Sequence, residues 1–571
     1  MKQTNRIRPF TAQFFRGNRL NALTALSMSI LLAAVNLPLS WLLQQITDYV
    51  ACSGAQPLSR LVLYTVAGIL ILVPVHMVYR TVYPRFLARA MAQYKQYLFG
   101  EITKKNISTF SRENTSRYLS ALTNDAASIE TNYLAGFFTM VELVIYLVGA
   151  VAMMLWYSPL LTAAALALSL LPILASALTG TRLTDAEKQV SAENERFVGT
   201  VKDLLSGFTV IKSFRAESEA QRLFSEKNET AEACKCRRKT TEQTISVFAS
   251  TASITAQLGT FLVAAWLSGR GMGITPGMVV VFLQLVGLTI EPIRQLPKLL
   301  ANRRAARALI EKMADALAEG VTAGGEAVGA ELRQDITLEH ITCGYDAEKP
   351  VLRDLSVTFE AGKRYAIVGP SGSGKSTLLN LLTGGAADYA GEVRFDGREL
   401  RGLDRDSLCD LISMVQQNVF VFNDTIRNNI TMFREFPQEA VDSAIRRAGL
   451  SALIEAKGED YVCGENGCGL SGGERQRISI ARCLLRGTPV MLIDEATAAL
   501  DKQTAAAVMD AILDIGGLTR IAVTHQLEEA LLSRFDQILV LRGGQICERG
   551  TFGELMDRRG LFYSLYTVSQ S

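Results

Sequence analysis

The chain has few of the residues that build zinc centres, disulfide frameworks or nucleic-acid surfaces. Its 571 residues include nine cysteines and only three histidines. No two cysteines stand at the CxxC spacing of a structural zinc site, and an odd, irregularly spaced set predicts reduced thiols. The formal net charge is only +3, so the overall charge argues against a nucleic-acid partner.

Charged residues are almost absent from six long stretches of the first 300 residues. Each stretch has about 20 or more residues, the length that crosses roughly 30 Å of hydrocarbon as a helix. Buried helices of a soluble protein are the alternative, but six such runs in one region argue against it. The sequence therefore predicts an all-α transmembrane domain over residues 1–300. Its expected spans lie near residues 20–47, 61–83, 131–157, 158–181, 243–269 and 271–298.

Basic residues determine the predicted orientation. Residues 1–19 carry lysine and arginine but no acidic residue, a bias that places the N-terminus in the cytosol. The apolar run that follows is too long for a secretory signal. Six crossings return the chain to the cytosol, so we expect a multi-pass protein of the cell (inner or plasma) membrane with a cytosolic second half. The charge-rich connections 80–130 and 182–242 are expected to form helical arms on the cytosolic side.

A few ionisable residues stand inside or beside the predicted spans. Such a residue is costly in a bilayer and indicates a function by default, so Glu142 and Glu291 are candidate substrate contacts. Pairing with a polar group on a neighbouring helix is the alternative for Glu142, and Pro292 is expected to loosen the helix after Glu291. His76 and Arg80 stand toward the cytosolic end of the second span, where an interfacial position is expected.

The pattern changes after a linker at residues 301–333. Residues 334–571 alternate short β-branched runs with helical ones, which predicts an α/β domain. The strand 364–368 leads into the glycine-rich run 369–377, and a helical run follows. This is a GxxxxGK[ST] loop, whose backbone N–H groups and helix N-terminus bind the phosphates of ATP, so the α/β domain is expected to be of the P-loop NTPase class. The expected ATP-binding residues of the loop are Gly369, Ser371, Gly372, Ser373, Gly374, Lys375, Ser376 and Thr377.

Two further strands end in side chains suited to ATP hydrolysis. The strand 490–493 is followed by Asp494 and Glu495, and another apolar strand is followed by His525. Carboxyl ends of parallel strands share the edge at which ligands bind in open α/β sheets. We expect Asp494 and Ser376 to hold Mg²⁺, and Glu495 to act as general base for the attacking water. An isolated Asp-Glu pair is more often a helix cap, but its place downstream of a P-loop favours catalysis.

Together these motifs resemble those of ATP-binding cassette (ABC) transporters, specifically exporter-type half-transporters, over nearly the whole chain. The strongest element is the run LSGGERQR at 470–477, which matches the family's LSGGE/Q signature ahead of the Walker B strand. The resemblance implies adenine stacking by Tyr345, a catalytic Q-loop at Gln417 that senses Mg²⁺ and water, a D-loop at Asp501 and a switch histidine at His525. It also implies that the signature contacts ATP held by a second cassette, through Ser471, Gly472, Gly473 and Glu474.

The resemblance extends to the membrane half. The segments 122–130 and 207–214 resemble coupling-helix regions, which transmit cassette movement to the membrane helices. Two departures from the family's pattern are Gln416, where proline is frequent, and Ala498, where the D-loop usually has serine. The resemblance implies a dimer, with an identical or a degenerate second half, that closes on ATP and alternates access across the lipid bilayer.

Neither the substrate nor the direction of transport can be read from the sequence. The leading hypothesis is export of a small amphipathic molecule, a lipid or a peptide, driven by ATP with Mg²⁺. The alternative on the same fold is an importer of a metal-chelating siderophore. A channel whose ATPase only gates is disfavoured by the intact Glu495 and His525, and the six spans exclude a soluble cassette. Because no peptidase domain precedes the first span, we expect no processing of leader peptides.

Overall fold

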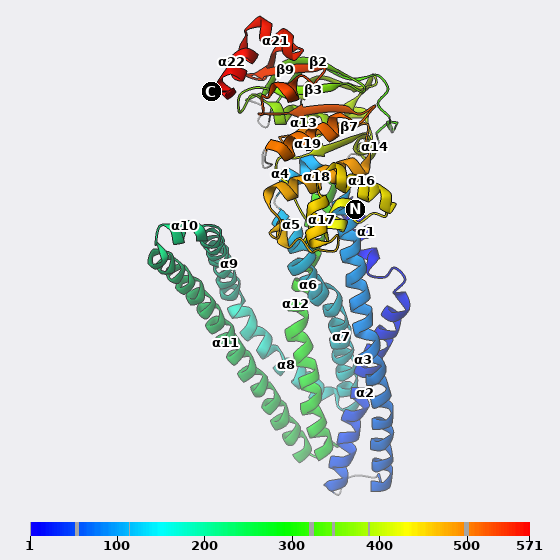
Figure 1. The fold of residues 1–571 in the computed structure, drawn as a ribbon. Coiled ribbons are helices and arrows are strands. Elements are labelled where there is room, and N and C mark those ends of the chain that lie inside the picture. Colours follow the sequence, from blue (N-terminus) through cyan, green and yellow to red (C-terminus); the bar gives the residue numbers. More distant parts are fainter. Residues whose placement is uncertain are drawn as a thin grey trace. The chain divides into compact units, whose positions relative to one another are not determined.

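The structure is a computed structural model, which describes residues 2–51, 56–113, 115–318, 325–329, 331–344, 349–385, 389–495 and 502–570. The chain divides into two compact units (Figure 1). The helical unit comprises residues 1–103 and 115–319, and the α/β unit comprises residues 104–114 and 320–571.

Long helices make up the helical unit, as its leucine- and alanine-rich apolar runs predict. Within the described residues, five are long and apolar enough to cross a membrane: α2, α3, the helix Thr115–Tyr157, α11 and α12. The elements are α1 (Lys2–Gln13), α2 (Arg19–Val50), α3 (Leu58–Thr103), α5 (Thr115–Ser120), η1 (Ala121–Asp125), α6 (Ala126–Ser128), η2 (Ile129–Ala135), α7 (Gly136–Tyr157), α8 (Pro159–Leu168), α9 (Leu170–Ser206), α10 (Phe208–Ser213), α11 (Glu217–Gly269) and α12 (Pro276–Ala318).

The fourth predicted span, 158–181, is divided between two helices. α8 ends at Leu168 and α9 begins at Leu170. The hydroxyl of Ser169, between them, donates to the carbonyl of Ala165 at 2.7 Å, and such a bond competes with the regular backbone ladder. Hydropathy does not register this break because apolar residues lie on both sides of it. The count of six crossings therefore stays a prediction.

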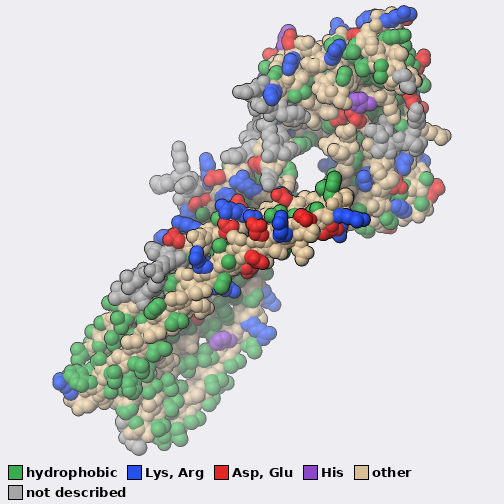
Figure 2. Space-filling model, turned by 90° about the vertical axis from the view of Figure 1, so that its left-hand side faces the viewer, with side chains coloured by type: hydrophobic (Ala, Val, Ile, Leu, Met, Phe, Trp, Pro, Cys, Tyr) green, Lys and Arg blue, Asp and Glu red, His purple; other side chains and the backbone are tan. Residues whose placement is uncertain are grey.

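Apolar side chains cover much of the surface of the helical unit. Leu63, Leu70 and Leu262 expose 64%, 68% and 68% of their area. Figure 2 shows hydrophobic side chains gathered over one end of the unit, and charged side chains over its arms. A soluble surface rarely carries so large an apolar area, so this end is suited to contact with lipid.

The expected helical arms are present. α3 continues for 46 residues, to Thr103. α9 packs along α11, and α10 lies at the turn between them (Figure 1). These helices extend beyond the apolar stretches, and their charged parts contain no proline except Pro84 of α3.

The predicted coupling region 122–130 and the segment just before it fall in different units. Residues 122–130 belong to the helical unit, whereas residues 104–114, with α4 (Ile107–Arg112), group with the α/β unit. An ion pair closes this short segment, because the fully buried Lys105 Nζ lies 2.7 Å from Glu113 Oε1. The role of residues 122–130 in coupling stays a prediction.

Two sheets form the α/β unit. A four-stranded antiparallel sheet has the order β2-β1-β4-β5. A six-stranded sheet has the order β10-β9-β3-β8-β7-β6, and only its edge strand β10 is antiparallel. The strands are β1 (Asp335–Cys343), β2 (Leu352–Glu360), β3 (Arg364–Val368), β4 (Tyr389–Phe395), β5 (Arg398–Glu399), β6 (Ile412–Val415), β7 (Val490–Asp494), β8 (Thr519–Val523), β9 (Gln537–Arg542) and β10 (Gln545–Gly550).

The parallel sheet positions the site. Its strands β7 and β8 are buried along their whole length, which requires cover on both faces. Their carboxyl ends, with that of β3, lie at one edge of the sheet because β3, β8 and β7 are parallel neighbours.

The helices of this unit beyond α4 are α13 (Lys375–Leu382), α14 (Arg405–Leu411), α15 (Ile426–Thr431), α16 (Gln438–Arg447), α17 (Ser451–Lys457), α18 (Gly472–Arg486), α19 (Lys502–Leu513), α20 (Glu529–Leu532), α21 (Phe552–Arg558) and α22 (Leu561–Gln570), with short 3₁₀ turns at Leu400–Gly402 and Glu465–Gly467.

Candidate functional site

The glycine-rich loop connects β3 to α13, and two of its positions admit only glycine. Gly369 has φ +156°, and a Cβ there would lie 2.1 Å from the carbonyl oxygen of Leu541. Gly374 has φ +104°, and a Cβ there would lie 2.7 Å from a methyl carbon of Leu352. These positions let the backbone turn tightly against the sheet, so that α13 begins directly at Lys375.

Two polar side chains of this loop are buried and suited to a phosphate group. Lys375 Nζ donates to the carbonyl oxygens of Gly369 at 2.9 Å and Pro370 at 3.1 Å. Burial lowers the pKa of the Lys375 ammonium, although the carboxylates of Glu495 and Asp494 act to raise it. Ser373 is 4% exposed, and its Oγ has no hydrogen-bond partner within the described structure. A buried polar atom without a partner is costly unless a ligand satisfies it, so the loop fits an anionic ligand.

Two oxygen atoms converge beside the loop. Ser376 Oγ, in the first turn of α13, donates to Asp494 Oδ1 at the end of β7 over 3.2 Å. Burial raises the pKa of Asp494, and the hydrogen bond from Ser376 partly offsets that effect. Mg²⁺ prefers a few protein oxygens and takes its remaining ligands from water and phosphate. Ser376 and Asp494 therefore fit the predicted magnesium site.

Glu495 is held by two side chains that follow the ends of other strands, β6 and β8. Its Oε1 accepts from His525 Nε2 at 2.7 Å, and its Oε2 accepts from Gln417 Nε2 at 2.8 Å. The backbone of Glu495 has φ +50°, an uncommon conformation that costs about 1–3 kcal/mol for a residue other than glycine. Its amide donates to the carbonyl of Val523 at 3.2 Å, which fixes the turn. Strain of this kind is concentrated at functional sites.

The predicted signature residues form a separate helix N-terminus. Ser471 is the N-cap of α18, and its Oγ accepts from the amide of Glu474 at 3.2 Å. Glu474 in turn accepts from the amide of Ser471 at 2.7 Å. This capping box leaves the amides of Gly472 and Gly473 at the positive end of a 15-residue helix. The arrangement suits an anion approaching from outside the helix.

The structure brings together Lys375, Ser376, Asp494, Glu495, His525 and Gln417, and it places Thr377 in the first turn of α13. Gly369, Ser371, Gly372, Ser373 and Gly374 make the loop itself. The predicted adenine-stacking Tyr345 and the predicted D-loop Asp501 lie outside the described residues.

The two acidic residues predicted as substrate contacts have partners on the protein. Tyr146 Oη donates to Glu142 Oε1 at 2.9 Å, and Asn36 Nδ2 of α2 donates to Tyr146 Oη at 2.9 Å. Glu291 accepts from Arg294, its neighbour on α12, at 2.7 Å. Partners on the protein account for the presence of both charges, so their role in substrate contact stays a prediction.

Sequence reasoning missed one buried pair near the site. Asn429 is fully buried, and its Nδ2 donates to the carbonyl oxygens of Phe422 and Thr425, each at 3.0 Å. Its Oδ1 accepts from Arg482 Nη2 of α18 at 2.9 Å. The pair joins the segment after Gln417 to the signature helix. An asparagine between two buried isoleucines of α15 was the available signal, although nothing in the sequence identifies its partner.

Comparison with known proteins decides the family. The family model described as the ABC transporter transmembrane region matches residues 23–293, and the family model described as ABC transporter matches residues 352–498. The ATP-dependent lipid A-core flippase of Photobacterium profundum is 32% identical over 485 residues, which are 82% of this chain and 81% of that protein. The flippase of the same description from Escherichia coli (strain K12) is 30% identical over 492 residues, 83% and 82% of the two chains. The chain belongs to the ABC transporter family.

The fold of this ABC transporter is also that of a solved exporter. The structure of a bacterial Atm1-family ABC exporter with ATP bound superposes with a TM-score of 0.84. The identity is 24%, and the match covers 97% of this chain and 98% of that one. The predicted fold class is therefore confirmed: a helical transmembrane domain precedes an α/β nucleotide-binding domain.

Membership of the family establishes the class of activity. The chain is an exporter-type ABC half-transporter, a multi-pass membrane protein whose ATPase is coupled to transport. The relatives do not favour the siderophore importer that the sequence left open.

Proposed function

We propose that this ABC half-transporter works as a homodimer that hydrolyses ATP at the edge of the parallel sheet and moves an amphipathic lipid across the membrane. The observation that carries the proposal is the position of Glu495, fixed at 2.7 Å from His525 and 2.8 Å from Gln417 beside the phosphate loop. The N-terminus and the ATPase domain lie in the cytosol in this proposal, because the basic residues of 1–19 favour that side.

ATP binds through the loop between β3 and α13. The backbone N–H groups of the loop and the N-terminus of α13 receive the phosphates. The Lys375 ammonium exchanges its two carbonyl partners for β- and γ-phosphate oxygens, which compensate its buried charge better than neutral carbonyls do. The unpartnered hydroxyl of Ser373 gains a hydrogen bond at the same time. Ser376 and Asp494 would hold Mg²⁺, which would neutralise charge on the phosphates.

Hydrolysis requires a base and a positioned water. The Glu495 carboxylate takes a proton from water as the water oxygen attacks the γ-phosphorus, and ADP leaves with the electron pair of the broken P–O bond. His525 and Gln417 each donate to one carboxylate oxygen, so they hold its plane in place. Three strands contribute these groups, and a small displacement of one strand end relative to another would misalign them.

The helix N-terminus at Ser471 supports a dimer. It offers amides to an anion but is a different helix from α13, so a single cassette would bind ATP with only one of the two N-termini. In the proposed dimer the γ-phosphate bound by one loop contacts Ser471 and Gly473 of the second cassette. The chain itself carries the complete set of Lys375, Glu495 and His525, which two identical sites require. Hydrolysis then removes the bridging phosphate and lets the cassettes separate.

The relatives support a lipid as the transported molecule. Two proteins at least 30% identical to this chain over more than four-fifths of its length are named ATP-dependent lipid A-core flippases. A lipid has an apolar body and a polar head group, which is the amphipathic chemistry expected from the sequence.

A flipping assay tests the proposal. The purified chain is placed in liposomes that contain a phospholipid with a nitrobenzoxadiazole-labelled head group, and the fraction open to dithionite is measured with and without Mg·ATP. ATP is expected to change that fraction with the wild-type protein and not with Glu495→Gln. A protein that hydrolyses ATP without any ATP-dependent change in a panel of phosphoglycerolipids and phosphorylated glycolipids would contradict lipid transport.

A further inference from the structure

The α/β unit contains a groove between four helices, α16, α17, α18 and α19. α16 packs against both α18 and α19, and the four helices lie close together in Figure 1. This α16–α19 groove has a volume of about 600 Å³, which is within the range of ligand pockets. Its described lining includes no residue of the phosphate loop and none of Asp494, Glu495 and His525. The groove is therefore a place separate from the ATP loop.

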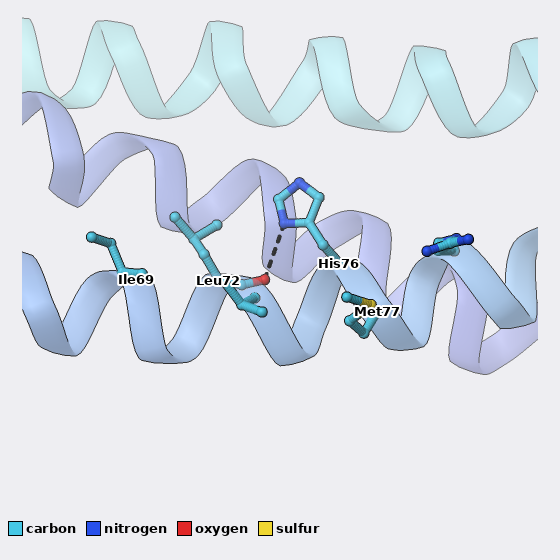
Figure 3. A pocket seen from close by; sticks show the side chains of 6 residues that line it. Ile69, Leu72, His76 and Met77 are labelled. Atoms are coloured by element: carbon cyan, nitrogen blue, oxygen red, sulfur yellow. Dashed lines mark hydrogen bonds between the residues drawn. The ribbon is translucent and has the colours of Figure 1, made fainter.

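A hollow on the helical unit differs in kind from the α16–α19 groove. Figure 3 shows Ile69, Leu72, His76 and Met77, which line this hollow and all belong to α3. Nδ1 of His76 lies 3.0 Å from the carbonyl oxygen of Leu72 on the same helix. One exposed helix face does not enclose a ligand, whereas the α16–α19 groove has walls from four helices.

The charge of the α16–α19 groove is mainly positive. Among its described lining residues the cationic side chains are Arg446, Arg447, Lys457 and Arg477, and the acidic side chain is Glu474. Guanidinium groups bind phosphate and carboxylate groups through two parallel N–H donors. The groove thus favours an anionic ligand.

The fold itself accounts for three of these cations. Lys457 Nζ donates to the carbonyl oxygen of Gly469 at 2.8 Å. Arg446 and Arg447 stand in the last turn of α16, where the helix dipole favours a positive charge. The presence of these three residues alone therefore indicates no ligand.

Arg477 is the cation that the fold leaves unsatisfied. A Cβ at Gly449 would lie 3.6 Å from Arg477 Cδ and 3.6 Å from Val508 Cγ2, so the stem of Arg477 packs between helices. Its Nε is buried and has no hydrogen-bond partner within the described structure. In the same part of the chain no ion pair joins Arg477 to Glu474, three residues earlier on α18. A buried donor without an acceptor is costly, and an oxyanion in the groove would supply the acceptor.

A phosphate suits this guanidinium better than a carboxylate does. A phosphate monoester carries up to about two negative charges and three acceptor oxygens, so it can bind more than one guanidinium at once. Since Nε of Arg477 is closed off from solvent, the ligand meets the outer edge of the guanidinium first. Arginine has a long and flexible stem, so a rotation of the side chain can bring Nε to the same phosphate.

The rest of the groove is apolar and lined by small side chains. Leu453 and Val508 are 7% and 2% exposed and lie beneath exposed alanines of α17 and α19, such as Ala456 and Ala507. Ligand pockets typically combine such an apolar lining with a few polar groups that fix the orientation of the ligand. A flat aromatic or apolar group can rest on this surface while its phosphate reaches Arg477.

We propose that the α16–α19 groove binds a phosphate monoester with an apolar or aromatic body. Arg477 receives the phosphate, Arg446 and Arg447 attract it from the rim, and the body of the ligand rests over Leu453 and Val508. Arg477 stands on α18 six residues after Ser471, so the ligand contacts the helix that carries the signature. This inference does not rest on the proposed function, because binding requires neither ATP nor a transported lipid.

Fluorine NMR of 4-fluorophenyl phosphate tests the groove directly. The full-length chain carries Lys375→Ala, so that the phosphate loop does not compete, and it is purified in detergent without nucleotide. Broadening of the probe signal during a titration gives the Kd. Adding Arg477→Gln is expected to weaken binding about 10- to 150-fold, because hydrogen bonds from a charged donor are lost. Arg477→Lys should be intermediate, since it keeps the charge and loses the two parallel donors.

Substitutions of exposed arginines provide the controls. Arg434→Gln is the matched control, because Arg434 is exposed in the same unit, lies outside the groove and has no ion pair within the described residues. It should bind the probe as the background chain does. Arg446 and Arg447 are exposed, so their joint replacement by glutamine should leave the fold intact and weaken binding about 2- to 25-fold. This double variant decides the matter if circular dichroism shows that Arg477→Gln is unfolded.

Three further probes separate the parts of the ligand. Inorganic phosphate lacks the apolar body and should bind at least about 10-fold more weakly than 4-fluorophenyl phosphate. 4-Fluorobenzoate has a single negative charge and should also bind more weakly. 4-Fluorophenol lacks the anionic group and should show no saturable binding.

Several results would overturn the proposal. Unchanged affinity in Arg477→Gln would show that this side chain holds no phosphate, and an equal loss in Arg434→Gln would show that only general charge attraction acts. Equal binding of inorganic phosphate would remove the role of the apolar surface, and equal binding of 4-fluorobenzoate would reject a phosphate ligand. Tighter binding of a hexaglutamate peptide than of 4-fluorophenyl phosphate would assign the groove to an acidic segment of a partner protein instead.

Discussion

Replacement of Glu495 by glutamine tests the proposed chemistry most sharply, because the two side chains have the same shape. Glutamine keeps the volume and one acceptor oxygen but cannot take a proton from water. A positioned general base contributes about 10²- to 10⁴-fold to a rate, which is about 3–5 kcal/mol of barrier. The expected result is a fall in kcat of that size, measured as phosphate release at saturating Mg·ATP, with nucleotide binding retained.

Replacement of the neighbouring His525 tests how much the positioning of Glu495 contributes to kcat. His525→Ala removes a donor 2.7 Å from the Glu495 carboxylate, and a hydrogen bond to a charged group contributes about 1.5–3 kcal/mol. Its kcat should therefore fall about 10- to 150-fold. Since His525 acts through Glu495, the double variant should be little slower than Glu495→Gln alone.

The chain offers a matched control histidine. His340 Nδ1 also lies 2.7 Å from a carboxylate, that of Asp354, but on the antiparallel sheet and exposed to solvent. His340→Ala should leave kcat unchanged. Phosphate release by Glu495→Gln at more than a tenth of the wild-type rate would refute the base assignment, and full multiplication of the two effects in the double variant would refute the positioning role of His525.

Three other substitutions test the α/β unit. Lys375→Ala should weaken ATP binding by at least 10-fold in a fluorescent-nucleotide titration, because two charged phosphate contacts are lost; unchanged affinity would contradict the loop assignment. Asn429→Ala leaves Arg482 Nη2 and one backbone amide without their acceptor, and each such loss costs about 1–3 kcal/mol. The free energy of unfolding of the α/β unit in urea should therefore fall by about 2–6 kcal/mol. A fall below 1 kcal/mol would show that the pair is dispensable. The Arg364 guanidinium holds the pKa of Asp536 below its ordinary 3.8. The Asp536 carboxylate therefore stabilises the fold above that pH, and this contribution is lost as the pH falls through the lowered pKa. Asp536→Asn should lower the melting temperature at pH 7, and the difference in melting temperature between variant and wild type should be smaller at pH 2–3. An equal difference at the two pH values would contradict the pairing.

The ATP site was predictable because its residues are local in sequence or stand at strand ends. The loop 369–377 is one contiguous motif, and two of its three glycines, Gly369 and Gly374, occupy positions where a Cβ would collide with residues of neighbouring strands. Asp494 and Glu495 follow an apolar run, so the geometry of parallel strands predicts the edge at which they meet Ser376. Each of these inferences needs only the residues next to the motif.

Contacts between distant residues were not predictable in the same way. Asn429 and Arg482 are 53 residues apart, and no local pattern selects one as the partner of the other. The break at Ser169 depends on a single hydroxyl that bonds to the carbonyl of Ala165 inside an apolar run. The sequence predicted a polar partner for Glu142 but not which residue it is, because the packing of the helices decides which of them lie beside α7.

The central claim is that ATP hydrolysis at Glu495 moves a lipid between leaflets. The most direct measurement places the wild-type protein and Glu495→Gln side by side in liposomes of one lipid composition, and records phosphate release and the dithionite-accessible fraction of labelled lipid in the same sample. The account predicts that both signals appear with wild-type protein and Mg·ATP, and that both are lost in the variant. Lipid movement that continues at the wild-type rate in Glu495→Gln, or without ATP, would contradict it.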